Sequence, residues 1–246
     1  NFRLLGTAIA IALKGTVLGI AKLAASIFLD PVTVVLEKLE QKRCPEGRAA
    51  LVIVDAQKDF TCAGTLEING KTVEYADGRL GVPGGYEIVP HINTLITKLK
   101  PGNHVAASQD YHPADHGSFG SNVGVKITEK YLLNGATQTA WPDHCVQGTE
   151  GADFLPGLLT DKIKYVVKKG LDITVDSYSA FADNTGLNET ALDEKLKSLN
   201  VKRLYVVGIA TNFCVGDTAL GGKSREYDVT VIEEGCRAVP DKYSPP

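Results

Sequence analysis

The sequence predicts an α/β fold with an open, mostly parallel sheet of about six strands and with helices on both faces. Two observations support this prediction. Apolar runs of strand length recur along the chain, and segments with helical periodicity separate them. The chain has 246 residues, of which 43% are hydrophobic and 22% charged, so it is long enough for one large domain with an extension. Alternating strands and helices are typical of parallel sheets with right-handed crossovers.

Five apolar runs are the predicted strands, and two amphipathic segments are the predicted helices. In chain order, the strands are LVIVDA (51–56), HVAASQD (104–110), YVVKKG (165–170), LYVVGIA (204–210) and VTVIEEG (229–235). The helices, EIVPHINTLITKLK (87–100) and ALDEKLKSLN (191–200), carry apolar residues at helical spacing and charge on the other face. Residues 61–86 and 117–157 are rich in Gly, Asn, Thr and Pro, so we expect long loops there.

The first 29 residues differ from the rest of the chain. They contain no acidic residue, and Arg3, Lys14 and Lys22 fall within about a 100° arc of an ideal helix. This pattern predicts an amphipathic helix that charges interrupt too often for a membrane span. Our first interpretation is packing on the body or on another subunit of a homo-oligomer, and the second is contact of residues 1–29 with a membrane surface. We expect residues 1–48 to form this helical extension and a linker.

Charge and cysteine content exclude some classes of function. The formal net charge of -3 shows no basic excess, which argues against nucleic acid as a partner. The cysteines are odd in number and scattered, without a CxxC pair, so neither a disulfide framework nor a thiolate zinc site is indicated. This usage favours a cytoplasmic location, while secretion or membrane association stays open because of the N-terminal segment. The five cysteines are Cys44, Cys62, Cys145, Cys214 and Cys236.

The residues that close the apolar runs are candidates for the active site, because ligands of open α/β sheets bind outside the carboxyl ends of the strands. Asp55, Asp110 and Lys169 close three runs, and Cys214 lies just past a fourth. A thiol attacks a carbonyl carbon as the thiolate, so Asp55 would accept its proton and Lys169 would stabilise the ion pair. The structural alternatives are a core cysteine, a helix-capping aspartate and a surface lysine.

A second cluster, in DYHPADH, indicates a metal site. Asp110 and His112 are two residues apart on an extended chain, so their side chains share a face. His116 follows in a turn, and His144 in WPDHC offers a further ligand. Without a metal, these histidines would be structural.

Five segments together resemble, in order and spacing, the nicotinamidases of the isochorismatase-like (cysteine hydrolase) family. The resemblance covers residues 49–240, leaves the N-terminal segment outside, and implies an isochorismatase-like hydrolase domain over residues 49–246. The segments are DAQKDF (55–60), DYHPADHGSF (110–119), WPDHCVQGTEGADF (141–154), Lys169–Gly170 followed by YSAF (178–181), and GIATNFCV (208–215).

The resemblance implies a catalytic triad of Asp55, Lys169 and Cys214. It also implies a cis peptide bond between Ile209 and Ala210, and an oxyanion hole made by the N–H groups of Ala210 and Cys214. The implied reaction is nicotinamide plus water giving nicotinate and ammonia. Cys214 would form a thioester with the carboxamide carbon, Asp55 would pass the thiol proton to the departing ammonia, and water would cleave the acyl-enzyme.

The resemblance also implies one divalent transition metal, zinc first, with iron and manganese as alternatives. The matching ligands are Asp110, His112 and His144, while His116 occupies a position that binds metal in only some members. The metal would hold the ring nitrogen of the substrate, directly or through water. The aromatic walls around the pyridine ring would be Phe60 and Trp141, with Tyr178 as a further contributor.

Two other functions stay open. One is another amidase or a ureide hydrolase of the same family, against which the metal motif argues. The other is a non-catalytic assembly or membrane-associated protein on this fold, against which the triad argues.

Overall fold

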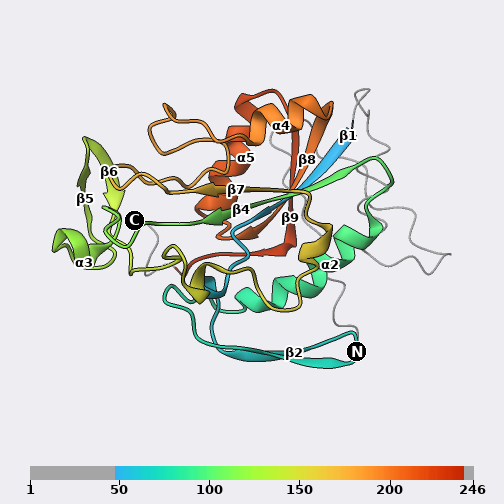
Figure 1. Ribbon diagram of the computed structural model, residues 1–246, viewed down its shortest axis with the longest axis horizontal. Coiled ribbons are helices and arrows are strands. Elements are labelled where there is room, and N and C mark those ends of the chain that lie inside the picture. The colour runs from blue at the N-terminus through green and yellow to red at the C-terminus, as the bar shows by residue number, and fades with distance from the viewer. Residues whose placement is uncertain (1–47, 241–246) are drawn as a thin grey trace, which may run out of the picture.

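Each of the five apolar runs forms a strand of one sheet in the computed structural model, which describes residues 48–240 (Figure 1). All neighbouring strands of this sheet are parallel. The sequence predicted about six strands, and the sheet has five, because the other strands of the described residues form separate two-stranded hairpins. The strands are β1 (Arg48–Val54), β4 (His104–Asp110), β7 (Tyr165–Lys169), β8 (Val201–Ile209) and β9 (Asp228–Arg237).

The order of the strands across the sheet is β7-β4-β1-β8-β9, which is a doubly wound order. The chain first moves outward from β1 through β4 to β7, and then returns to β8 on the other side of β1. The direction therefore reverses beside β1, at the carboxyl ends of the central strands. In open α/β sheets this reversal opens the crevice in which ligands bind. Central strands are covered on both faces, so almost every residue of β1 and β8 is buried.

Both predicted helices are present. Helix α2 (Ile88–Lys98) buries Ile88, Ile92 and Leu95 on one face, and α4 (Leu192–Ser198) buries Leu192 and Leu196. A third long helix, α5 (Cys214–Ser224), follows β8 directly. Figure 1 shows α4 and α5 on one face of the sheet and α2 on the other, so both faces are covered.

The expectation of two long loops was wrong, since each contains an antiparallel hairpin. Strands β2 (Gly64–Ile68) and β3 (Lys71–Tyr75) pair within residues 61–86. Strands β5 (Lys130–Leu133) and β6 (Ala136–Thr139) pair within residues 117–157. An Asn-Gly pair with positive φ at both residues joins the strands of each hairpin. Asn-Gly between alternating residues is a strong sequence signal for such a turn. The loop prediction rested on the overall Gly, Asn, Thr and Pro content and did not use this signal.

The remaining elements are short. Between residues 48 and 240, no helix is long and apolar enough to cross a membrane. The predicted amphipathic helix over residues 1–29 lies outside the described residues. The short elements are η1 (Lys58–Phe60), η2 (Gly85–Glu87), α3 (Gly120–Val123), η3 (Glu150–Ala152) and η4 (Thr160–Lys162).

Candidate active site and metal centre

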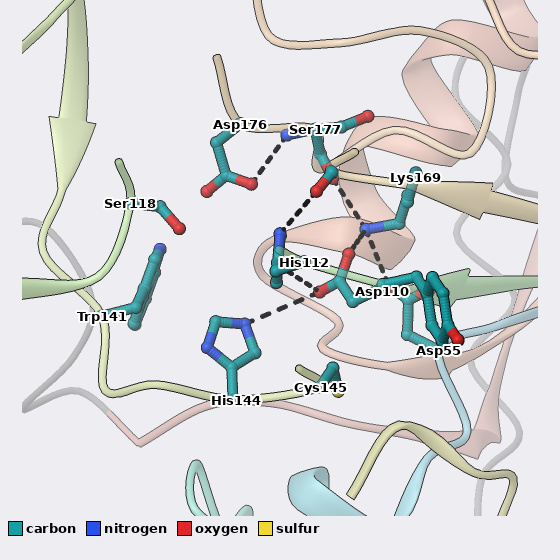
Figure 2. A network of polar contacts seen from close by, with 12 residues as sticks. Asp55, Asp110, His112, Ser118, Trp141, His144, Cys145, Lys169, Asp176 and Ser177 are labelled. Atoms are coloured by element: carbon teal, nitrogen blue, oxygen red, sulfur yellow. Dashed lines mark hydrogen bonds and ion pairs between the residues drawn. The ribbon is translucent and has the colours of Figure 1, made fainter. Parts of the chain in front are cut away.

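The carboxyl ends of the adjacent strands β7, β4 and β1 bring Lys169, Asp110 and Asp55 together (Figure 2). Lys169 ends β7 and is in register with Asp110, which ends β4. Its Nζ lies 2.9 Å from Asp55 Oδ2 and donates a hydrogen bond to Asp110 Oδ1. It also donates to the carbonyl oxygen of Ser177 at 2.7 Å, and it lies 3.5 Å from Cys214 Sγ. One ammonium group therefore contacts both carboxylates and the thiol.

Burial and these ion pairs set the protonation of Lys169 and Asp55. Burial lowers the pKa of Lys169, but the carboxylates of Asp110 and Asp55 outweigh this effect and hold the pKa well above its usual value. Burial raises the pKa of Asp55 to about 6, which the Lys169 cation opposes and the Asp110 anion reinforces. Lys169 therefore stays a cation, whereas Asp55 titrates near neutral pH, where a group can both accept and return a proton.

Cys214 is the first residue of α5, directly above the end of β8. Burial raises the pKa of its thiol well above the usual value, and the Lys169 cation lowers it only in part. The thiol consequently keeps its proton until a base removes it. A carboxylate oxygen of Asp55 lies within 4.8 Å of the sulfur, so the geometry offers this thiol a base.

A buried metal-ligand set lies on the other side of Asp110. Asp110 Oδ2 is 3.7 Å from His112 Nε2 and 3.7 Å from His144 Nε2 (Figure 2). Burial raises the pKa of Asp110, but the Lys169 cation and His112 overcome this effect and keep the pKa well below its usual value. Asp110 is therefore a permanent carboxylate that faces two imidazoles.

The hydrogen bonds of both histidines favour metal binding through Nε2. His112 Nδ1 lies 2.9 Å from the carbonyl oxygen of Gly170, and His144 Nδ1 lies 2.7 Å from that of Pro142. Because a carbonyl oxygen only accepts, each Nδ1 carries a proton, so Nε2 is the nitrogen whose lone pair a neutral imidazole offers to a metal. One carboxylate and two imidazoles with further positions open are a ligand set that suits a catalytic divalent metal.

The position that follows Lys169 requires glycine. Its φ of +65° is a conformation that side chains rarely adopt. A Cβ at this position would also lie 2.2 Å from His112 Cε1. Glycine therefore lets the backbone turn away from β7 and leaves room for the imidazole.

His116 belongs to a neighbouring group. Its ring lies 4.3 Å from that of His112, centroid to centroid, and its Nδ1 is 2.7 Å from Ser118 Oγ. Its Nε2 is buried and has no hydrogen-bond partner among residues 48–240. Ligand atoms of His112, His116 and Asp176 lie within 4.8 Å of one another, and this group shares His112 with the set around Asp110.

A pocket lies beside both groups, and all three predicted aromatic residues line it. Phe60 contacts His144 at 5.4 Å between ring centroids, and Trp141 Nε1 donates a hydrogen bond to Tyr178 Oη at 3.0 Å. Ala210 also lines the pocket, and the peptide bond that precedes it is cis. The lining residues are Phe60, Leu80, Asp110, Trp141, His144, Asp176, Tyr178, Ala210, Phe213, Cys214 and Val239.

Sequence reasoning missed three residues of this site. Ser108 Oγ donates a hydrogen bond to Asp55 Oδ1 at 2.7 Å. Its signal was available, since it lies two residues before Asp110 on the same strand face. Phe213 precedes Cys214 and packs edge-on against Trp141, at 5.0 Å between ring centroids. Asp176, buried beside the pocket, lies before YSAF and carries no strand-end signal.

Comparisons with known proteins cover most of the chain. The isochorismatase domain family matches residues 49–244. The nicotinamidase of Escherichia coli (strain K12) is 44% identical over 191 residues, which cover 77% of this chain and 83% of that protein. A solved structure described as Acinetobacter baumanii nicotinamidase pyrazinamidease has a TM-score of 0.71 at 35% identity, covering 82% of this chain and 89% of that one. The pyrazinamidase of Pyrococcus horikoshii in complex with zinc has a TM-score of 0.59 at 30% identity, covering 80% and 89%. The chain therefore belongs to the isochorismatase family.

Proposed function

We propose that this protein is a cysteine amidohydrolase that converts nicotinamide and water into nicotinate and ammonia. The observation that carries the proposal is the position of Lys169 Nζ, 2.9 Å from the Asp55 carboxylate and 3.5 Å from the Cys214 thiol, beside a pocket with aromatic walls. The relatives named above, which are nicotinamidases and pyrazinamidases, support this choice of substrate.

The first half of the reaction forms a thioester. Asp55 takes the proton of the Cys214 thiol, and the thiolate attacks the carboxamide carbon. Lys169 stabilises the thiolate before this attack, because its ammonium group is held beside the sulfur. Asp55 then gives the same proton to the departing nitrogen, which leaves as ammonia. A carboxyl with a pKa of about 6 suits both transfers.

In the second half, water cleaves the thioester. Asp55 accepts one proton from this water and returns it to the Cys214 sulfur as the thioester breaks. The nicotinic acid that forms loses the second proton to solvent and leaves as nicotinate. In both halves a negative charge develops on the carbonyl oxygen of the substrate. We assign its stabilisation to the backbone N–H groups of Ala210 and Cys214, whose residues share the pocket. Phe60 and Trp141 would hold the pyridine ring between them, with Tyr178 positioned by its hydrogen bond from Trp141.

We further propose that Asp110, His112 and His144 hold one divalent transition metal. Zinc is our first choice, since the Pyrococcus horikoshii neighbour binds it, and iron and manganese are the alternatives. Such a metal would supply a Lewis acid that binds the ring nitrogen of the substrate. His116 would support this site through its contact with His112 and stays a candidate additional ligand. The same ligand set argues against a ureide hydrolase.

Three expectations from the sequence stay proposals. They are the division of the chain at residues 48 and 49, assembly into a homo-oligomer, and a cytoplasmic location. The family match over residues 49–244 supports the division. The contact proposed for residues 1–29, with a subunit or a membrane surface, concerns residues outside the described range.

Ammonia release from nicotinamide by the purified full-length chain tests the function. Ammonia and nicotinate should appear in equal amounts, and a chelator should raise KM or abolish turnover, with recovery after zinc is restored. Absence of ammonia release from the zinc-loaded protein would refute the proposed function. Turnover that is indifferent to chelator, in a protein without bound metal, would refute the metal site alone.

A further inference from the structure

Asp176 is a buried carboxylate of the pocket to which the mechanism above gives no task. It is 3% exposed, and it lines the same pocket as Cys214, Ala210 and the aromatic walls. A buried carboxylate that faces a ligand pocket is costly unless hydrogen bonds compensate it, so its presence calls for an explanation.

Hydrogen bonds fix the position of the Asp176 carboxylate. Its Oδ1 accepts from the N–H of Ser177 at 2.7 Å (Figure 2), and its Oδ2 accepts from Gln138 Nε2 at 2.8 Å. Gln138 Nε2 also lies 3.3 Å from Tyr178 Oη, so the carboxylate is tied to the aromatic wall. Donors therefore occupy both oxygens of Asp176 and fix the carboxylate beside the pocket.

Asp176 changes the net formal charge around the pocket. The carboxylates of Asp55, Asp110 and Asp176 outnumber the single ammonium of Lys169 by two formal charges. A divalent cation on the proposed metal ligands would cancel that excess. With Asp176 the loaded site is then formally neutral, and without it the site would carry one positive charge. The substrate of the proposed reaction is a neutral carboxamide, whereas the product is an anion, so this difference acts on the product.

We propose that Asp176 is a specificity-determining residue that keeps the pocket electrically neutral, so that the carboxamide binds while the carboxylate product is released. This inference rests on the proposed function and adds the basis for product release. Electrostatic interactions are strong in a buried pocket, where water and salt screen them little. Removing the charge of Asp176 should therefore strengthen the binding of pyridine carboxylates and leave neutral pyridines unaffected.

The test compares the affinity of two ligands with the same ring, nicotinate and the neutral 3-acetylpyridine, for the zinc-loaded full-length protein. Trp141 is the single tryptophan of the sequence and lines the pocket, so its fluorescence reports binding without any turnover. We expect Asp176→Asn to bind nicotinate about tenfold more tightly than the wild type, by the electrostatic argument above. Its affinity for 3-acetylpyridine should change less than about twofold. In turnover assays, inhibition by nicotinate should strengthen with little change in KM for nicotinamide.

Two matched variants separate charge from structure. Asp176→Glu keeps the charge and should bind nicotinate within about threefold of the wild type. Asp172→Asn removes an exposed carboxylate from the same loop and should leave both affinities unchanged. Unchanged nicotinate affinity in Asp176→Asn, or an equal change for both ligands, would overturn the inference. An effect of Asp172→Asn as large as that of Asp176→Asn would overturn it too.

If Asp176→Asn fails to fold, the ligand preference of the wild type still tests the inference. The wild type should bind 3-acetylpyridine more tightly than nicotinate, and equal or tighter nicotinate binding would overturn the inference. Failure of the proposed function would be seen separately, as absence of ammonia release from nicotinamide by the wild type. The fluorescence measurement of ligand preference does not depend on that result.

Discussion

The site contains two groups of side chains that the fold holds in different ways. The strand-end group comprises Asp55, Asp110 and Lys169, which stand at the carboxyl ends of three adjacent strands. The register of the sheet places them, since β1 pairs with β4 and β4 with β7 along their lengths. The loop group comprises His144, Trp141 and Tyr178, whose positions depend on individual hydrogen bonds such as those of His144 to Pro142 and of Trp141 to Tyr178.

The two groups have different tasks in the proposed mechanism. Asp55 and Lys169 of the strand-end group act in proton transfer together with Cys214, a task for which small displacements are costly. The third member, Asp110, contacts Lys169 and also belongs to the proposed metal ligands. The loop group would hold the pyridine ring through Trp141 and Tyr178 and would complete the metal ligands through His144. Changes at Asp55 or Lys169 should therefore lower kcat, and changes in the loop group should act on the binding of substrate or metal. The predictions below test this separation, from the largest expected effect to the smallest.

Replacement of the nucleophile should have the largest effect. Cys214→Ser should lower kcat at least about 1,000-fold, because a hydroxyl is far harder to ionise than a thiol and no other group replaces it. Affinity for nicotinamide, followed by Trp141 fluorescence, should stay within a few-fold of the wild type. Cys62→Ser changes a half-buried cysteine outside the pocket and serves as the control. A kcat for Cys214→Ser within tenfold of the wild type would contradict the thioester mechanism.

Loss of a loop-borne ligand should act on the metal first. His144→Ala should weaken zinc binding at least about 100-fold, measured by metal titration of the stripped protein, because one of three proposed ligands is gone. His116→Ala is the matched variant, and it should weaken binding less because its imidazole lies outside the set around Asp110. Equal zinc affinities for the two variants would contradict the assignment of His144, rather than His116, to the metal ligands.

The acid limb of the pH profile should report Asp55. Asp55 must be ionised to accept the thiol proton, and its pKa is raised to about 6, so kcat/KM should fall as the pH drops through that value. Ser108→Ala removes a hydrogen bond to the carboxylate, which should raise the pKa further. The acid limb should then move to higher pH by about half a unit. A limb that stays in place, or moves to lower pH, would assign the titration to another group.

The smallest effect is expected far from both groups. Gly70→Ala alters the turn of the β2–β3 hairpin, where φ is +73° and no atom lies within 4 Å of the added Cβ. The cost should be backbone strain alone, about 1 kcal/mol in the free energy of unfolding by denaturant titration. Both kcat and KM should stay at wild-type values. Altered kinetics in this variant would mean that the hairpin takes part in the reaction.

The sequence by itself determined the strands and the residues that close them. Run length and apolar character are local properties, so the five apolar runs predicted the five strands of the sheet. Chain position then placed Asp55, Asp110 and Lys169 at one edge, because parallel strands all end on the same side. The pair Lys169–Gly170 also had a local signature, which the close approach of His112 explains.

Only the tertiary structure decided the order of the strands and the contacts between distant segments. The placement of β7 beside β4, with β1 in the centre, brings Lys169 to Asp55, 114 positions earlier in the chain. Asp176 lines the pocket because the fold brings its loop beside Gln138, which donates a hydrogen bond to its carboxylate. Such contacts depend on how elements pack, and packing involves residues far apart in the chain, on which local patterns carry no information.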